Sequence, residues 1–497
     1  MHLTMRLLEM DVLVIRIESL CHMLWGGESP FINVFRGWEG RLPNGYLSSR
    51  FLFPTWESVP RYCSSHSRLA SRNSCLPPAA VLGFAAAGME GLSALWLLLY
   101  LSVSVLCFYF GRAVHYLRTR THIPAEINPS RKLLVLTVGM HFARRLAVFL
   151  EKVGLCHRYE AWRLFFKGIA PRKSSALITK DLDFDGVNVR VYWPRTLPAG
   201  NARGMVVVPG GFGLCGSIQA YERMSRYIAR ESNTVVVNVG FRLAPEHPCP
   251  AQIQDCCVAT EHFLKNAADY GVDPARISIG GESSGASFSA AVCQVLAGKR
   301  LLPKLRAQIL LYPYLQAVDF NLPSYQQNGS VPPLFRKFTL THGTMYLTGK
   351  AIDVEGIISG NHIPEDLRAK YSKWVSADHV PDEFKARGYR PVEPAPFSNE
   401  QYESLKKGLD SLFSPLLAED NVIRQLPETL LVTSEYDILR DDGILYRKRL
   451  LDNGVPVTWH HIEDGVHGMT STIDFGLLEF PNARRSLQHV VLFLEGL

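Results

Sequence analysis

The sequence predicts an α/β protein with a mostly parallel sheet and helices on both of its faces. Short apolar stretches alternate with helical stretches through much of the 497-residue chain, which is typical of strands joined by right-handed crossovers. One predicted strand runs directly into the turn Gly281–Gly285, a G-x-S-x-G motif, and a helix of small residues follows it. Far upstream, Gly91–Gly111 is an uncharged stretch long enough to cross a bilayer.

The first 111 residues divide into an extension and an anchor. Residues 1–88 contain Arg but no Lys and show no clear periodicity, so we interpret them as a loosely ordered extension, with a helix over Leu7–Leu20 as the alternative. The 21 residues Gly91–Gly111 would form a helix roughly 31 Å long. No small-residue cleavage site ends this stretch, and Arg112, Arg118 and Arg120 follow it. These features favour a retained transmembrane signal anchor over a removed signal peptide or a buried core helix.

Residues 112–497 are expected to form one large domain. Amphipathic helices are predicted over Leu133–Leu155 and Arg158–Lys167, and residues 112–175 are interpreted as part of a cap. A Pro-rich and mixed polar stretch from about Gln316 to Lys407 is too long for an ordinary loop, so we interpret it as a second cap element, over about 316–407. The candidate strands are Leu182–Trp193, Met205–Val208, Thr234–Val239, Ile277–Gly280, Ala307–Tyr312, Thr429–Ser434 and Val457–Ile462.

Positive charge is concentrated after the predicted anchor. The whole chain carries a formal charge of +7, yet the stretch from Arg112 to Lys173 alone holds 13 Lys or Arg against 3 acidic residues. Leu, Val, Phe and Trp are interleaved with these charges, which favours a membrane-facing basic amphipathic region over a nucleic-acid site. The alternative explanation of this pattern is that the charges lie on solvent-exposed faces of helices whose apolar residues pack into the core.

Cysteine usage excludes two classes of protein. Ten cysteines in 497 residues are too few for a disulfide scaffold, and none falls in a CxxC or Cys/His ligand spacing. The sequence still allows one or two disulfides if the catalytic domain is lumenal. We expect neither a metal nor an organic cofactor.

Three short segments supply a nucleophile, an acid and a base in that order. They are Gly281–Gly285 with Ser283, Tyr436–Asp441 with Asp437, and Asp464–Gly468 with His467. The order Ser, acid, His is that of α/β-hydrolases and differs from the orders of chymotrypsin-like and subtilisin-like folds. The G-x-S-x-G motif alone would occur by chance in about one chain in six of this length. Its strand-turn-helix setting and the two partner motifs make it informative.

Further motifs carry a family resemblance. Phe241–His247 reads FRLAPEH and Asp437–Asp441 reads DILRD, and with His467-Gly468 they make residues from about Met89 to Leu497 resemble the arylacetamide deacetylase-like proteins. These proteins belong to the hormone-sensitive-lipase-like branch of the α/β-hydrolases. The resemblance implies an eight-stranded sheet under a helical cap and acyl esters or amides as substrates. It also implies a single-pass anchor in the endoplasmic reticulum membrane with a lumenal catalytic domain.

The resemblance assigns a catalytic role to one residue in each of the three motifs. Ser283 would attack the acyl carbonyl, His467 would take and return the proton, and Asp437 would orient the imidazole. We expect His460 and His461 to be structural. Asp441 and Asp442 have an alternative reading as helix N-terminal caps.

The predicted oxyanion hole departs from the family pattern. The backbone amides of Gly210, Gly211 and Ser284 are expected to stabilise the oxyanion. Where relatives read His-Gly-Gly-Gly, this chain places Pro209 and Phe212 in the first and last positions. Loss of one such donor typically costs about 2.7 to 4 kcal/mol of transition-state stabilisation. A catalytically weak or silent lipid-binding or interaction protein is therefore the alternative to a membrane-anchored serine esterase or deacetylase.

Asn328-Gly329-Ser330 is an acceptor sequence for N-glycosylation. We expect it to lie on an exposed loop of the cap, which would favour a lumenal domain. The Arg residues after the anchor argue for the opposite orientation. The expected partners are a lipophilic ester or acetylated small molecule and a membrane, with no nucleic acid.

Overall fold

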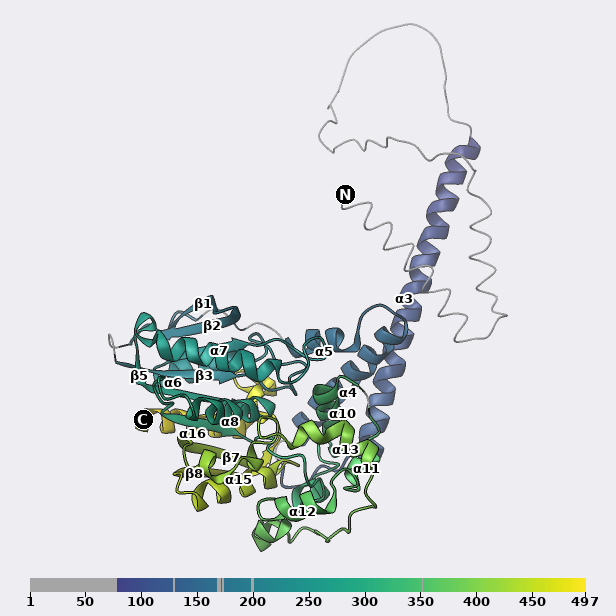
Figure 1. The fold of residues 1–497 in the computed structure, drawn as a ribbon. Coiled ribbons are helices and arrows are strands. Elements are labelled where there is room, and N and C mark those ends of the chain that lie inside the picture. Colours follow the sequence, from purple (N-terminus) through teal and green to yellow (C-terminus); the bar gives the residue numbers. More distant parts are fainter. Residues whose placement is uncertain (1–77, 128–129, 168–170, 172–173, 198–200, 351) are drawn as a thin grey trace, which may run out of the picture. The chain divides into compact units, whose positions relative to one another are not determined.

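An eight-stranded sheet forms the centre of the computed structural model, which describes residues 78–127, 130–167, 171, 174–197, 201–350 and 352–497 (Figure 1). The strand order is β1-β2-β4-β3-β5-β6-β7-β8, and every pairing from β4 to β8 is parallel. The predicted α/β class and mostly parallel sheet are therefore confirmed. The strands are β1 (Leu177–Phe184), β2 (Val187–Pro194), β3 (Ala202–Val208), β4 (Thr234–Gly240), β5 (Val272–Glu282), β6 (Ala307–Leu311), β7 (Glu428–Tyr436) and β8 (Val457–Val466).

The first two strands correct one prediction. The single strand expected over Leu182–Trp193 is wrong, because the chain reverses at Asp185-Gly186 and forms an antiparallel hairpin of β1 and β2. Both turn residues have positive φ, 53° and 92°. An Asp-Gly pair adopts these angles readily, and it is a common two-residue hairpin turn. The Asp-Gly pair that favours this turn lies within the stretch that was predicted as one strand.

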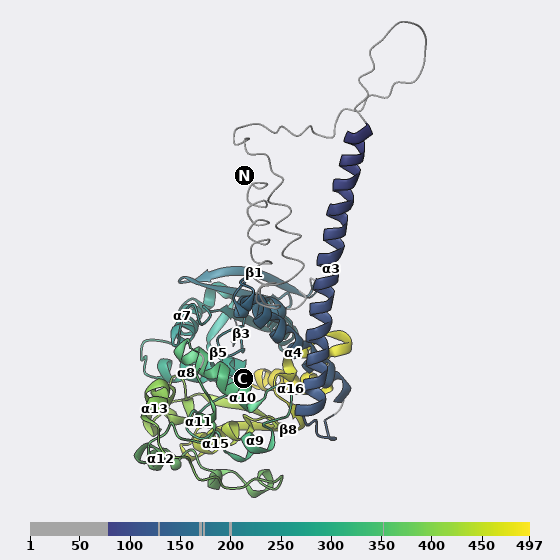
Figure 2. The ribbon, with the colours of Figure 1, turned by 90° about the vertical axis from the view of Figure 1, so that its right-hand side faces the viewer.

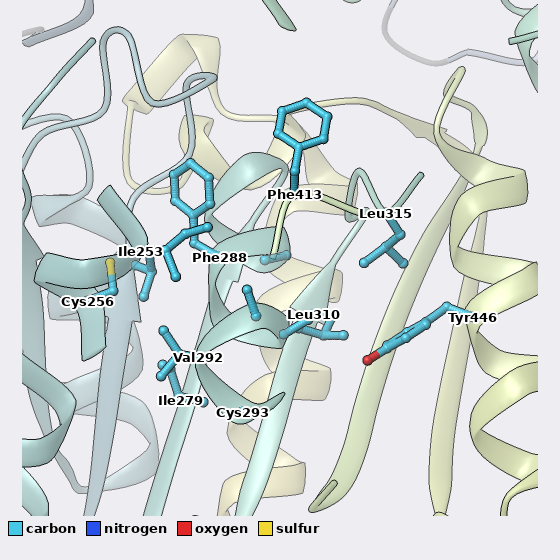
Figure 3. Packing of buried hydrophobic residues seen from close by; sticks show 14 of the residues in the cluster. Ile253, Cys256, Ile279, Phe288, Val292, Cys293, Leu310, Leu315, Phe413 and Tyr446 are labelled. Carbon is cyan, nitrogen blue, oxygen red and sulfur yellow. The ribbon is translucent and has the colours of Figure 1, made fainter. Parts of the chain in front are cut away.

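Helices cover both faces of the sheet. Along β3, Val206 and Val208 belong to one buried cluster and Met205 and Val207 to the other, as the two-residue period of a strand requires. Helices α7 (Ala251–Lys265), α8 (Ser284–Ala297) and α15 (Arg440–Asp452) contribute to the first cluster, and α6 (Glu222–Ser232) and α16 (Pro481–Gly496) to the second. Figure 3 shows Val292 and Cys293 of α8 near Ile279 of β5 and Leu310 of β6.

The stretch interpreted as a second cap element lies between β6 and β7. Its described residues form five α-helices, and Figure 1 shows α10, α11, α12 and α13 grouped on one side of the sheet. They are α9 (Pro323–Gln327), α10 (Arg336–Thr348), α11 (Glu355–Ile358), α12 (Glu365–Ser372) and α13 (Asn399–Leu405). This insertion therefore stands at the edge of the sheet where α/β enzymes bind their ligands.

In the described part of the chain, three helices precede the sheet: α3 (Pro78–Arg120), α4 (Ser130–Lys152) and α5 (Arg158–Lys167). Two of them have stretches that are long and apolar enough to cross a membrane, Trp96–Arg120 in α3 and Ser130–Lys152 in α4, whereas the sequence predicts one. Much less of the α3 stretch is buried than of the α4 stretch. The chain divides into two compact units, and Tyr109–Val148 belongs with Cys156–Leu497 in the larger one. The predicted extension over residues 1–88 falls largely outside the described residues.

Two buried acidic side chains of α15 accept hydrogen bonds from the start of the insertion between β6 and β7. Asp442 accepts hydrogen bonds from the Leu315 N–H at 2.9 Å, the Gln316 side-chain amide at 3.1 Å and the Tyr325 hydroxyl at 3.2 Å. Asp441 accepts one from the Ser324 N–H at 2.6 Å. Both carboxylates thus bind the inserted segment, and the alternative role as helix N-terminal caps is wrong, because the N-cap residue of α15 is Leu439 and no side chain caps the helix.

The Asp442 carboxyl makes the folding stability depend on pH. Burial raises its pKa from 3.8 to about 7, so between these values the folded chain binds a proton that the unfolded chain releases. This contribution to stability is complete below about pH 4 and is lost as the pH rises through 7, by up to about 1.4 kcal/mol per pH unit. In thermal unfolding of the detergent-solubilised chain between pH 5 and pH 8, we expect Asp442→Asn to unfold with a shallower pH dependence than the wild type. Equal slopes for the two proteins would contradict the assignment.

Candidate active site

Ser283 lies on a strained turn between β5 and α8. Its φ and ψ are 56° and −127°, a conformation that non-glycine residues rarely adopt and that projects the side chain away from the sheet. The Ser283 N–H donates to the Leu311 carbonyl of the next strand at 2.9 Å, which fixes the turn. This geometry is the strand-turn-helix arrangement that the G-x-S-x-G motif predicts.

The two glycines of the motif permit a close backbone approach. A Cβ at Gly281 would lie 2.4 Å from the Val208 carbonyl oxygen, and a Cβ at Gly285 would lie 2.1 Å from the same oxygen. No side chain fits at either position, because real Cβ contacts do not fall below about 3 Å. The end of β3 can therefore pass directly behind the nucleophile.

The structure brings the three predicted catalytic side chains together. The His467 Nε2 lies 2.8 Å from the Ser283 Oγ, and its Nδ1 lies 2.7 Å from the Asp437 Oδ2. Asp437 follows β7 and is 1% exposed, while His467 follows β8 and is 8% exposed. Asp437 also accepts the Leu439 N–H at 2.9 Å through Oδ1, which holds the carboxylate in one orientation.

The neighbouring histidines have other partners. The His461 Nε2 lies 3.0 Å from a carboxylate oxygen of Glu435, and the His460 ring stacks on the His489 ring at 3.7 Å. Neither of these described contacts involves Ser283.

The oxyanion segment contains one donor that the sequence did not indicate. The Phe212 N–H donates to the Ser284 Oγ at 2.8 Å, so the Ser284 side chain, as well as its predicted backbone amide, faces the oxyanion loop. Gly211 and Phe212 have φ of 104° and 60°. A Cβ at Gly210 would lie 2.6 Å from the Tyr221 hydroxyl and 3.4 Å from the Ser283 Cβ. Gly210, Gly211 and Phe212 line the same cavity as Ser283, and Ser284 follows it directly in the sequence.

A buried carboxylate lies beneath the nucleophile. Glu282 is 3% exposed and accepts hydrogen bonds from the hydroxyls of Tyr221 and Tyr312, each at 2.7 Å, and from that of Thr470. Burial raises the pKa of both tyrosines well above the usual value, so they stay protonated as donors. The Tyr312 ring also contacts the His467 ring edge to face at 5.0 Å. Glu282 therefore links the nucleophile turn to the segment that carries His467.

Two cavities meet at Ser283. The smaller has a volume of ≈ 50 Å³ and an almost wholly apolar lining from α8, α10 and the loop before α14 (Asp420–Ile423). The larger has a volume of ≈ 580 Å³ and is lined by residues of α4, α5, the oxyanion loop and the His467 segment. Ser283, Phe212 and Leu334 line both cavities. The two cavities therefore adjoin each other beside Ser283 and Phe212.

The predicted exposed loop at Asn328 is wrong. The Asn328 side chain is fully buried and donates to the backbone carbonyls of Glu435 at 2.9 Å and Asp437 at 3.0 Å. Its Oδ1 accepts from Arg387 at 3.3 Å. A glycan on the amide nitrogen would break both donor bonds and would not fit the interior. Asn328 instead stabilises the loop that carries Asp437, which we call the acid loop.

The described residues also include seven cysteines, all of them free thiols. No group of three or more described His, Cys, Asp or Glu residues is arranged to hold a metal ion.

Comparisons with known proteins agree with this geometry. A family model described as alpha/beta hydrolase fold matches residues 205–361 and 392–471. The chain is 40% identical over 410 residues to human arylacetamide deacetylase-like 4, which covers 81% of this chain and 99% of the relative. The chain belongs to the arylacetamide deacetylase family of α/β-hydrolases.

Other members and structures of the fold extend the comparison. Mouse neutral cholesterol ester hydrolase 1 is 36% identical over 361 residues, covering 70% of this chain and 88% of the relative. The crystal structure of DphMB1 matches with a TM-score of 0.51 and 26% identity, covering 71% of this chain and 97% of that one. This member of the arylacetamide deacetylase family is a carboxylic ester hydrolase. The predicted enzyme class is thereby confirmed.

Loss of the Asn328 amide should weaken the fold and should not remove a glycan. We expect Asn328→Ala to lower the free energy of unfolding by about 1 to 3 kcal/mol, because two buried carbonyls lose their donor. Thermal unfolding measures the change. As a matched test of modification, treatment of wild-type protein with an N-glycosidase should leave its mass unchanged, and a loss of mass would contradict the buried position.

Removal of the Phe212 ring should join the two cavities. We expect Phe212→Gly to raise kcat/KM for decanoyl esters relative to acetyl esters by about tenfold, because each methylene accommodated in an apolar pocket is worth about 1 kcal/mol or more. Glycine also adopts the positive φ of this position without strain. Paired kinetics with p-nitrophenyl acetate and decanoate check this ratio. An unchanged ratio would mean that another residue sets the length limit.

Proposed function

We propose that this enzyme is a membrane-anchored serine hydrolase that cleaves carboxylic esters or acetyl groups of lipophilic substrates through an acyl-enzyme. The observation that carries the proposal is the position of His467, within hydrogen-bond distance of both Ser283 and Asp437. A hydrogen bond from the nucleophile to the base and another from the base to the acid define a serine-hydrolase triad. The apolar lining of both cavities supports a lipophilic substrate.

The first half of the reaction forms the acyl-enzyme. The Ser283 Oγ attacks the ester carbonyl carbon as its proton passes to the His467 Nε2, and the carbonyl oxygen becomes an oxyanion. We assign the stabilisation of this charge to the backbone amides of Gly210, Gly211 and Ser284. His467 then gives its proton to the leaving alcohol, and the acyl group stays on Ser283.

The second half repeats these steps with water. His467 takes a proton from the water molecule, and the hydroxide formed attacks the acyl carbon. Collapse of the second oxyanion returns the proton to the Ser283 Oγ and releases the carboxylic acid. Asp437 stabilises the imidazolium ion in both halves, and its burial strengthens this interaction.

The proposal includes a location. Residues Trp96–Arg120 supply a helix that satisfies the length and composition of a membrane span. Placement in the endoplasmic reticulum membrane with the catalytic domain in the lumen rests on the family resemblance, since the buried Asn328 no longer supports it. Protease protection of the catalytic domain in sealed microsomes checks the orientation, and digestion without detergent would contradict it.

The nucleophile and base can be tested directly. We expect Ser283→Ala to abolish labelling by a fluorophosphonate probe, because the probe traps the activated serine, and to lower kcat for p-nitrophenyl acetate by about 10⁴-fold or more. His467→Ala should lower kcat to a similar extent. Gel fluorescence and steady-state kinetics measure the two effects.

Matched controls come from the same elements. Ser289→Ala, on α8, and His460→Ala, on β8, should keep both labelling and turnover. If Ser283→Ala is labelled as strongly as the wild type, Ser283 is not the nucleophile and the proposal fails.

A further inference from the structure

Exposed apolar side chains lie in, or next in sequence to, the lining of the larger cavity. Val135 of α4, Phe165 of α5 and Leu478 all line this cavity. Beside them in the sequence, Leu164 is 68% exposed and Leu477 is 91% exposed. We refer to five exposed residues as the apolar rim: Leu134, Val135, Leu164, Phe165 and Leu477.

The apolar rim is larger than ordinary surface apolarity explains. Single exposed leucines are normal on soluble proteins, but a contiguous set around one opening marks an interaction surface. Here the five residues come from three separate segments, and each segment contributes a residue to the lining of the larger cavity, namely Val135, Phe165 and Leu478. Water would have to solvate all of them if nothing covered the rim.

The segments that carry the rim are fixed to the catalytic domain. On α5, Arg163 donates to the Leu214 carbonyl at 2.8 Å and to the Ala244 carbonyl at 2.7 Å, and it pairs with Glu246. On α4, the Lys132 ammonium donates to the Glu479 carbonyl at 2.8 Å. The rim is therefore a preformed surface held by buried and half-buried polar contacts.

The charges around the rim favour a phospholipid bilayer as its partner. Arg131 and Lys167 are exposed on the two helices that carry most of the rim. They belong to the stretch of 13 basic and 3 acidic residues between Arg112 and Lys173. Apolar side chains bordered by Lys and Arg are the pattern of surfaces that insert among acyl chains and bind anionic headgroups.

The end of the apolar helix α3 packs against α4 within the same unit. Phe110, which is 53% exposed, lies 6.2 Å from the Phe142 ring, and the Tyr116 ring stacks on His141 at 4.3 Å. The two views of Figures 1 and 2 both show the lower end of α3 beside α4. The helix that satisfies the requirements of a span thus ends on the helix that carries Leu134 and Val135.

From these observations we infer that the apolar rim inserts into the bilayer that α3 spans, so that the larger cavity opens into the lipid phase. Ester substrates dissolved in the membrane then reach Ser283 without crossing water. This inference rests on the membrane anchoring in the proposed function, and it adds the route and physical state of the substrate. It does not require any particular acyl chain.

The test separates entry from chemistry. Full-length protein is reconstituted in vesicles of four parts phosphatidylcholine to one part phosphatidylserine, and hydrolysis of a bilayer-dissolved long-chain ester is compared with that of water-soluble p-nitrophenyl acetate. The double variant Leu164→Asp/Leu477→Asp should hydrolyse the bilayer-dissolved ester at least tenfold more slowly and the soluble ester at the wild-type rate. The matched variant Leu301→Asp/Leu451→Asp, with two leucines exposed at the amino-terminal edge of the sheet, should lose neither activity.

A second readout does not depend on hydrolysis. In vesicles of phosphatidylcholine brominated on the acyl chains, the extra tryptophan emission of Leu477→Trp should be quenched, and that of Leu301→Trp should not. Equal quenching of the two, or equal loss of both ester activities in the rim variant, would overturn the inference. A wild type that hydrolyses neither ester would instead contradict the proposed function, while the quenching still tests the rim.

Discussion

The backbone contact between the end of β3 and the nucleophile turn is the constraint on which the site depends. The Val208 carbonyl oxygen lies where a Cβ of Gly281 or Gly285 would otherwise stand. Only because these two residues are glycines can β3, the turn and α8 approach so closely. This approach sets Ser283 beside the oxyanion loop and leaves its hydroxyl facing His467. The positive φ of Ser283 is a strain that the surrounding packing maintains.

A network of neutral hydroxyls and buried carboxylates then joins the parts of the site that lie far apart in the sequence. Glu282 connects the nucleophile turn to Tyr312 and Thr470, and Asn328 connects the insertion to the loop that carries Asp437. Buried polar groups of this kind are stable only when each finds a partner, so they fix one arrangement of the loops. Contacts with the sheet and contacts with the insertion thus both fix the catalytic geometry.

The sequence predicted the parts of the molecule that follow local rules. Short apolar strands gave the sheet, and the order of Ser283, Asp437 and His467 gave the side chains that the structure brings together. Local rules failed where the outcome depends on tertiary contacts. The Asn328 triplet is equally compatible with a surface loop and with a buried amide, and only the packing of the insertion against Glu435 decides between them. The Asp185-Gly186 turn was readable but lay inside an apolar run.

The attachment of the insertion to the acid loop restricts how this enzyme can diverge. The residues from Leu315 to Asn328 donate hydrogen bonds to Asp442, to Asp441 and to the backbone of Asp437. A change of length or path in this stretch would displace the carboxylate that orients His467. Farther along the insertion, Arg387 pairs with Glu435, whereas α10, α11 and α12 make none of the contacts described above to the loop that carries Asp437. New substrate preferences can therefore arise by remodelling the distal helices while the first turns of the insertion remain a fixed part of the proton relay.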